Sequence, residues 1–253
     1  MKHIKYSICT KFFLLLSVVF GISGTAQNST KSKKAPNLLI IIADQWRGQA
    51  LGFEGKEPVM TPYLDQYVKE SLVLNQMVSN YPVCSPARAM LMTGQYPIKN
   101  KVYSNVNSSS APFGVELQDD AVCWSDVLKQ NGYFNGYIGK WHLDSPYEPY
   151  IPTSNNFPVA WNEWTSPEKR HGFDYWYAYG TYDEHDKPMY WDTNDKRDEF
   201  KYVNQWGPIH EADKALTYLK NENGKIRKTD APFSLVVSMN PPHSNYQTVP
   251  DKY

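Results

Sequence analysis

The stretch Asn37-Leu38-Leu39-Ile40-Ile41-Ile42-Ala43 decides the fold class. It is an unbroken apolar run of strand length, and such a run is typical of a strand that is buried on both faces. Strands of this kind form the parallel sheet of α/β proteins, so we predict an α/β fold. A second run of the same type covers residues 233–239, and a shorter strand is predicted at residues 133–138.

Polar side chains follow each of these three predicted strands. Asp44 and Gln45 follow the first, Lys140 and His142 follow the second, and His243 follows the third. Ligand sites of open α/β sheets lie at the carboxyl ends of the strands, so we expect these side chains to share one site. Carboxylate and amide oxygens suit Ca²⁺ or Mg²⁺. Each pair has an ordinary alternative when taken alone. The alternative for Asp44 is that it caps the turn after the strand, and the alternative for Lys140 and His142 is that they are solvated on a loop.

A short helix is predicted next to this edge. Ser85 is a good N-cap, Pro86 suits the first helical position and Gly94 suits the C-terminal stop. Cys84 then lies just before the free N–H groups of the helix start, which attract anions. Arg88 follows one turn later and can reach the same place with a fork suited to an oxyanion.

Two motifs resemble the signatures of one family. Cys-Ser-Pro-Ala-Arg at residues 84–88, with Thr-Gly at 93–94, resembles the signature of the type I sulfatases. Residues 132–142, which run from Gly-Tyr to Gly-Lys-Trp-His, resemble the second signature, with Asn135 where the family usually has Thr. The resemblance implies the alkaline phosphatase-like fold, a mainly parallel central sheet flanked by helices. It covers residues 37–253, and because later family elements have no counterpart, we expect the N-terminal part of a catalytic domain, truncated at the C-terminus.

The resemblance also implies a chemistry. In this family the motif cysteine is oxidised to formylglycine, whose hydrate is the nucleophile. His243 would protonate the departing alcohol, and His142 would take a proton from the second hydroxyl. The implied catalytic residues are Cys84, Arg88, Lys140, His142 and His243; the implied ligands of a Ca²⁺ or Mg²⁺ ion are Asp44, Gln45 and the converted Cys84; the expected substrate contacts are Lys140, His243 and His185.

Residues 141–206 differ in composition from the rest. Six of the eight Trp fall here, with little helical or alternating period. We interpret the segment as long loops over the active-site face. Stacking of aromatic rings on sugars and ordinary packing under the loops are both open, and His185 is a candidate substrate contact.

The N-terminus predicts export. Residues 1–26 combine a basic start, a short apolar core at 12–20 and a small-residue cleavage site, which is the pattern of a secretory signal peptide. A retained anchor is the alternative. Residues 27–36 are a polar linker, and we expect a periplasmic or secreted protein without stable membrane insertion.

Two cysteines remain after cleavage of the signal peptide, Cys84 and Cys123. We place Cys123 as a buried thiol on a helix over residues 119–130, with Val122 and Val127 inward. A disulfide between the two cysteines would block conversion of Cys84.

The expected activity is hydrolysis of sulfate esters on a sulfated carbohydrate, after maturation by a formylglycine-generating enzyme. A phosphonate or phosphate ester hydrolase of the same superfamily is an alternative. A truncated, non-catalytic, exported sugar-binding protein with a Cys84–Cys123 disulfide is another. The 26 basic and 26 acidic residues balance, which gives no electrostatic case for nucleic acid.

Overall fold

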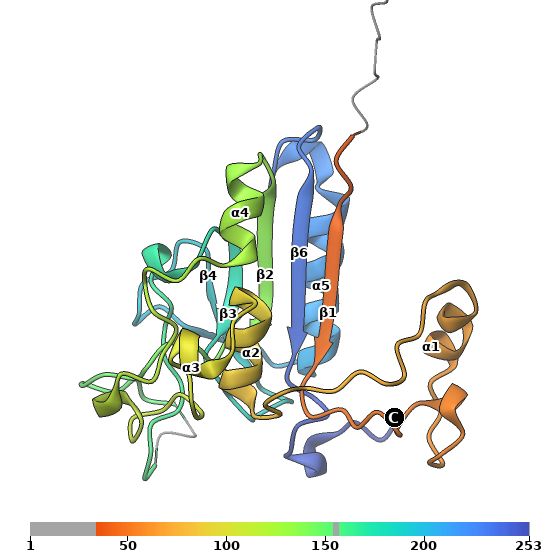
Figure 1. Ribbon diagram of the computed structural model, residues 1–253, viewed down its shortest axis with the longest axis horizontal. Helices are drawn as coiled ribbons and strands as arrows, with labels where there is room; N and C mark the ends of the chain where they lie inside the picture. Colours follow the sequence, from red (N-terminus) through yellow and green to blue (C-terminus); the bar gives the residue numbers. More distant parts are fainter. Residues whose placement is uncertain (1–33, 154–156, 253) are drawn as a thin grey trace, which may run out of the picture. The chain divides into compact units, whose positions relative to one another are not determined.

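The computed structural model describes residues 34–153 and 157–252, so the predicted signal peptide and residues 27–33 of the predicted linker lie outside it. Within this part, six strands form one sheet in the order β1-β6-β2-β3-β4-β5 (Figure 1). The first four run parallel and the last two pairings are antiparallel. The bounds are β1 (Leu38–Ala43), β2 (Phe134–Lys140), β3 (Tyr175–Tyr179), β4 (Met189–Asp192), β5 (Lys201–Tyr202) and β6 (Phe233–Met239). The predicted α/β fold with a mainly parallel sheet is confirmed.

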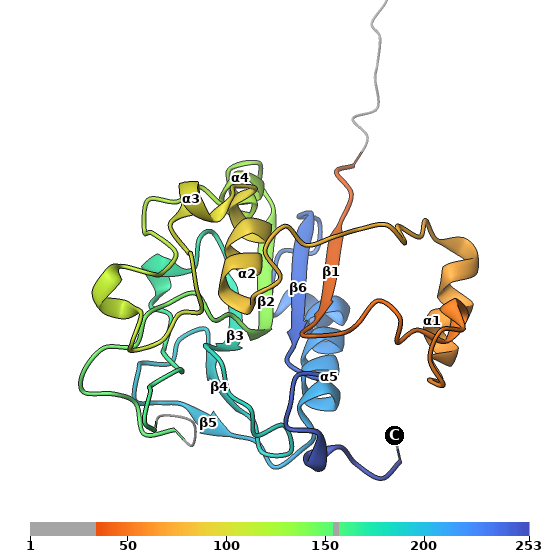
Figure 2. The ribbon, with the colours of Figure 1, turned by 60° about the horizontal axis from the view of Figure 1, so that its bottom comes forward.

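Helices cover both faces of the sheet. On one face, α5 (Gly207–Lys220) packs against β6 and β2; on the other lie α2 (Cys84–Thr93) and α4 (Trp124–Gln130), as Figures 1 and 2 show. The shorter helices are α1 (Pro62–Tyr67), α3 (Pro97–Asn100), η1 (Gly52–Glu54), η2 (Val68–Glu70), η3 (Ala111–Phe113), η4 (Pro167–Lys169), η5 (Glu222–Gly224) and η6 (Tyr246–Thr248). None of the helices in the described part of the chain has the length and apolarity to cross a membrane.

Each face of the sheet has its own hydrophobic core. Successive residues of a strand point to opposite faces, so Tyr137 and Trp176 join the core under α2 while Ile138 and Tyr177 join the core under α5. Both cores therefore lock β2 and β3 in the middle of the sheet, directly behind the strand ends that carry the polar residues.

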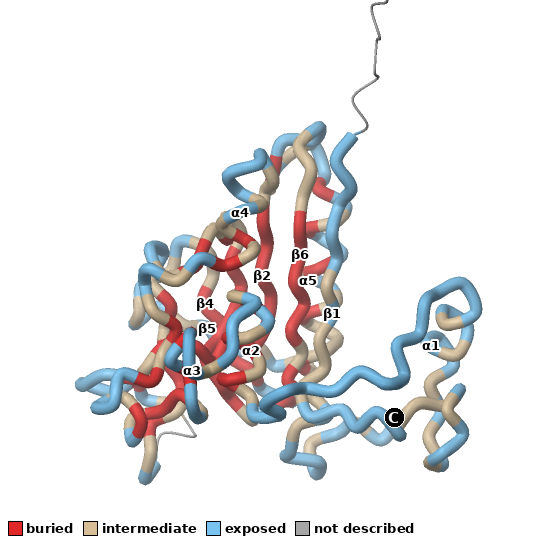
Figure 3. Tube along the Cα trace, viewed as in Figure 1, coloured by how far each residue is buried: buried red, intermediate tan, exposed pale blue. Residues whose placement is uncertain are grey.

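The prediction that the first strand is buried on both faces was wrong. β1 lies at the edge of the sheet and pairs with β6 alone. Ile40 and Ile42 pack against the core, whereas Leu39 and Ile41 are exposed, Ile41 to 66%. The trace of β1 accordingly shows exposed and intermediate residues where that of β6 is mostly buried (Figure 3). An apolar run indicates that its side chains prefer to be buried. It does not indicate how many strands or helices pack beside the strand in this chain.

The interpretation of residues 141–206 as loops was only partly right, because β3, β4 and β5 lie within them. Trp141, Trp176 and Trp191 are each 1% exposed and belong to the hydrophobic cores. Packing rather than sugar stacking therefore explains these three rings. β3 reads Tyr-Trp-Tyr-Ala-Tyr and has no polar alternation, which is why the pattern concealed a strand.

Two helix starts differ from the prediction. α2 begins at Cys84 itself, with Val83 as N-cap, because the Ser85 hydroxyl accepts a hydrogen bond from the backbone N–H of Val106 (3.0 Å). The Gly94 stop is confirmed by its left-handed conformation. α4 begins only after Cys123, so residues 119–122 lie before the helix. The prediction that Val122 and Val127 face inward was wrong, because both side chains are exposed to solvent.

Candidate active site

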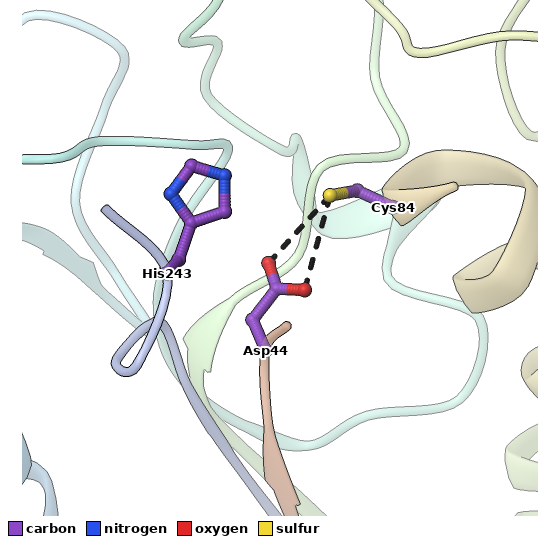
Figure 4. A group of neighbouring side chains, drawn as sticks. All are labelled: Asp44, Cys84 and His243. Atoms are coloured by element: carbon purple, nitrogen blue, oxygen red, sulfur yellow. Dashed lines mark hydrogen bonds between the residues drawn. The ribbon is translucent and has the colours of Figure 1, made fainter. Parts of the chain in front are cut away.

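Asp44, Cys84 and His243 meet at the carboxyl edge of the sheet (Figure 4). Strand pairing continues past β1, since the Asp44 N–H donates to the Met239 carbonyl (3.0 Å) at the end of β6. Cys84 approaches from the first turn of α2, and its Sγ lies 3.7 Å and 3.8 Å from the two Asp44 carboxylate oxygens. One ligand atom from each of the three residues lies within 4.8 Å of the other two.

Two buried cations hold the Asp44 carboxylate. Lys140 Nζ lies 2.6 Å from Oδ2 and Arg88 Nη2 lies 3.4 Å from it. Burial opposes ionisation of Asp44, but the positive charges of Lys140 and Arg88 outweigh it and hold the pKa of this carboxyl below its usual range. Asp44 is therefore an anion throughout the neutral range.

The same cations are tied to the protein frame. Arg88 Nη1 donates to the Lys140 carbonyl and to the Ser238 hydroxyl, both at 2.7 Å, and Lys140 Nζ donates to Asn240 Oδ1 (2.9 Å). β2, β6 and α2 are thus joined through one polar network under the site. The contact of Arg88 and Lys140 with a substrate stays a prediction, while their contact with Asp44 is observed.

Cys84 is not an activated thiolate. Burial raises the pKa of the Cys84 thiol most; Asp44 raises it further, and Lys140 and Arg88 oppose this without reversing it. A reactive cysteine needs a lowered pKa, so the unmodified thiol is a poor nucleophile here. Cys84 and Cys123, the cysteines in the described ranges, are both free, so the disulfide considered above is not formed in this structure.

His142 follows β2 in a left-handed conformation (φ 56°) and is buried. Its Nε2 lies 2.9 Å from the Val106 carbonyl, and its Nδ1 is buried without a hydrogen-bond partner. Burial, Lys140 and Arg88 lower the pKa of His142 well below the ordinary value, so the ring is neutral. A neutral imidazole with a free nitrogen can accept a proton.

The loop that carries His243 is hydrogen-bonded to the loop that carries His185. His243 Nδ1 lies 2.7 Å from the Ser244 carbonyl and 3.5 Å from Asp183 Oδ1. His185 is buried, and its Nε2 lies 3.0 Å from the His243 carbonyl. His185 therefore fixes the loop that carries His243, and its predicted contact with substrate stays a prediction. Both rings border an apolar cavity of about 500 Å³ that Trp206 also lines.

Several site residues were missed by sequence reasoning. Asn105 Oδ1 accepts the Ser85 N–H (3.2 Å), and Asn240 links Lys140 to Asp183 Oδ1 (2.9 Å from Asn240 Nδ2). Asn240 directly follows β6, so the rule that marked Asp44 at a strand end also marks this residue. Asn105 lies in an irregular loop and carries no such signal.

A cavity of about 510 Å³ opens above the anion, lined by Asp44, Gln45, Cys84, Arg88 and Asn105 among others. Asp44 and Gln45 both line this cavity, and carboxylate and amide oxygens are the hard donors that Ca²⁺ and Mg²⁺ prefer, so these residue types fit such an ion. Because Ca²⁺ takes about 6–8 oxygen ligands, water, substrate or further protein groups must complete the coordination.

The family model described as "Sulfatase" matches residues 36–253. The chain belongs to the sulfatase family. It is 44% identical over 234 residues to the endo-4-O-sulfatase of Bacteroides thetaiotaomicron, an alignment that covers 85% of this chain and 44% of that protein. It is 35% identical over 241 residues to the ulvan-active sulfatase of Formosa agariphila, covering 95% of this chain and 42% of that protein.

Solved structures agree with the fold. The sulfatase-family protein yidJ of Bacteroides fragilis superposes with a TM-score of 0.83 at 59% identity, covering 87% of this chain and 47% of that one. A protein from a Bacteroides thetaiotaomicron glycosaminoglycan-metabolism locus superposes with a TM-score of 0.76 at 43% identity, covering 83% and 45%. The predicted alkaline phosphatase-like fold is confirmed, and the sulfatase chain spans less than half the length of these relatives.

Near the candidate active site lies a buried carboxyl, Glu211 on α5. It is 1% exposed, and the Tyr190 hydroxyl donates to its Oε1 (3.0 Å). Gly139 in β2 lies beside it, where a Cβ would be 3.2 Å from the same oxygen and would clash more severely with the Ser238 carbonyl oxygen of β6. Burial raises the pKa of Glu211 to about 8, although Tyr190 and Tyr179 favour the ionised form. The carboxyl is therefore protonated at neutral pH.

We expect Glu211→Gln to flatten the dependence of stability on pH. Between the ordinary value of 4.5 and about 8, the folded state retains a proton that the unfolded state has lost, so the free energy of unfolding falls as pH rises. The loss is at most about 5 kcal/mol, at 1.36 kcal/mol for each pKa unit. Urea unfolding of both proteins at pH 5, 6, 7 and 8 measures it. Parallel profiles would show that Glu211 does not carry the proton.

Proposed function

We propose that the protein hydrolyses sulfate esters on a sulfated glycan, with Cys84 converted to formylglycine and a divalent cation held beside it. The placement of Cys84 against Asp44 and His243 carries this proposal, because a nucleophile, an anionic ligand and a proton donor occupy one small volume. The glycan class rests on the relatives, one an endo-4-O-sulfatase, one active on ulvan and one from glycosaminoglycan metabolism.

The protonated Cys84 thiol is a poor nucleophile, and conversion of Cys84 to formylglycine supplies a nucleophile in its place. The hydrated aldehyde has two hydroxyls. One hydroxyl loses its proton, and its oxygen forms a bond to the ester sulfur as the bond from sulfur to the alcohol oxygen breaks. The alcohol takes a proton from His243, and the proton released by the attacking hydroxyl restores the His243 ring. The second hydroxyl gives its proton to His142, the bond from carbon to the first oxygen breaks, and sulfate leaves as the aldehyde returns. The partnerless Nδ1 of His142 supports that role.

Asp44 and Gln45 hold the cation in this proposal. A bound divalent ion supplies Lewis-acid stabilisation of charge on the sulfuryl oxygens. Lys140 and Arg88 add fixed positive charge at the same edge, where a preorganised and buried cation acts more strongly than it would in water. Their own anchors, Asn240 and Ser238, keep that charge in place without substrate.

The proposal includes export and maturation. The N-terminal pattern of residues 1–26 favours a periplasmic or secreted protein, and a formylglycine-generating enzyme is the required partner before or during export.

A substrate panel tests the proposed activity. Sulfated disaccharides, an aryl sulfate and the matching aryl phosphate are incubated with protein from a host that has the maturation enzyme, and released sulfate or phosphate is measured. We expect sulfate release from a disaccharide, its loss on chelation, and its recovery with Ca²⁺ or Mg²⁺. Faster phosphate release would favour the phosphoesterase alternative, and turnover that survives exhaustive chelation would contradict the cation.

A further inference from the structure

A second cluster of metal-ligating side chains lies outside the proposed active site. Cys123 is the N-cap of α4, Asp126 is in the first turn of that helix, and His171 comes from the segment after η4. One ligand atom from each lies within 4.8 Å of the other two. Three different donor types from two separate segments of the chain converge on one point.

The distances fit a shared ligand better than they fit direct bonding. His171 Nδ1 lies 3.7 Å from Asp126 Oδ2, beyond the usual range of a hydrogen bond and close to the separation of two ligands on one ion. Asp126 Oδ2 accepts the Cys123 N–H (2.9 Å). Such an outer bond to a carboxylate orients metal ligands in known sites.

Cys123 and Asp126 form a capping box at the start of α4, in which the Cys123 side chain faces the Asp126 N–H and the Asp126 side chain accepts the Cys123 N–H. Ser, Thr, Asn and Asp are the preferred N-cap residues, and a cysteine is a weak acceptor in that position. Cys123 is completely buried, and burial together with Asp126 raises the pKa of its thiol to about 12. The thiol is therefore inert unless an ion displaces its proton, as thiophilic ions do.

A polar cavity of about 240 Å³ gives an ion access. Its lining includes Asp126 and His171 together with Asp119, Asp120 and Glu168, whereas the buried Cys123 lies behind it and does not line it. Lys169 offsets one of these charges, with its Nζ 3.4 Å from Asp119 Oδ1. The remaining carboxylates attract cations and can supply a fourth ligand.

We propose that Cys123, Asp126 and His171 form a structural site for Zn²⁺. A thiolate, an imidazole and a carboxylate match the ligand preferences of this ion, and the two negative ligands balance its charge. The ion would fasten the start of α4 to the segment at His171, where the Ser125 hydroxyl already donates to the His171 carbonyl (2.6 Å). The site is independent of the sulfatase chemistry proposed for Cys84.

Cobalt substitution tests the site on the full chain. All proteins carry Cys9→Ser and Cys84→Ser, which remove the other two thiols of the sequence, and are stripped with a chelator before titration with Co²⁺. We expect one equivalent to give the near-ultraviolet thiolate-to-cobalt absorption with the visible bands of tetrahedral cobalt, and Zn²⁺ to displace them. Adding Cys123→Ser should abolish the thiolate absorption, and adding His171→Gln should weaken Co²⁺ binding at least tenfold.

Circular dichroism identifies variants that fail to fold, and His171→Gln keeps the test valid if Cys123→Ser does not fold. Absence of the absorption in the folded protein that carries Cys9→Ser and Cys84→Ser alone would overturn the proposal. An absorption that persists without Cys123, or binding unchanged in His171→Gln, would also overturn it.

Discussion

Replacing Cys84 by alanine is expected to lower the turnover of sulfate esters by at least about 10³-fold, because no other group at this edge can replace the covalent nucleophile. Fold and stability should change little, since the thiol makes only long contacts to Asp44. The measurement compares the kcat of Cys84→Ala with that of wild type, both purified from a host that has the maturation enzyme. The free energy of unfolding is measured on the same samples.

The two readouts separate a chemical role from a structural one. If Cys84→Ala retained more than a tenth of wild-type turnover, the nucleophile would lie elsewhere. If turnover fell together with a loss of several kcal/mol of stability, Cys84 would be holding the site together rather than reacting in it. For a purely chemical role of Cys84, turnover falls while the free energy of unfolding stays within about 1 kcal/mol of the wild-type value.

Lys140→Met is expected to cost about 3–5 kcal/mol of stability as well as activity. It removes a side chain that is 1% exposed and leaves the buried Asp44 carboxylate with Arg88 as its remaining cation. Breaking a buried ion pair from one side leaves an uncompensated charge, which is the reason for the large cost. Urea unfolding and kcat measure the two effects.

Lys129→Met is the matched control. It breaks the pair with Asp174 (2.8 Å), but the Lys129 side chain is 52% exposed and such pairs contribute less than about 1 kcal/mol. Adding Asp44→Asn to Lys140→Met should recover part of the lost stability, because the stranded charge is then gone. Equal losses for Lys129→Met and Lys140→Met, or no recovery in the double variant, would contradict the buried network.

The sequence predicted where the strands end better than it predicted which elements pack beside them. Residues 233–239 form a strand with the predicted bounds, and Asp44, Lys140 and His243 follow or end strands as expected, because local apolar runs and chain direction determine both features. The edge position of β1 could not be predicted, since it depends on which elements the rest of the chain places beside it.

Side-chain contacts between residues far apart in the chain also could not be predicted from the sequence. Arg88 and Lys140 were expected to face a substrate, whereas in the structure both lie against Asp44, 44 and 96 positions away in the chain. No periodic pattern encodes such tertiary partners. His185 is a similar case, because its hydrogen bond to the His243 carbonyl joins loops 58 positions apart.

The mass of the peptide that contains residue 84 shows whether Cys84 is converted to formylglycine. Protein is expressed with and without a formylglycine-generating enzyme, digested and measured by mass spectrometry. We expect a peptide roughly 18 mass units lighter than the cysteine form when the enzyme is present, and the ordinary cysteine mass when it is absent. An unmodified Cys84 in protein that hydrolyses sulfate esters would rule out formylglycine as the nucleophile.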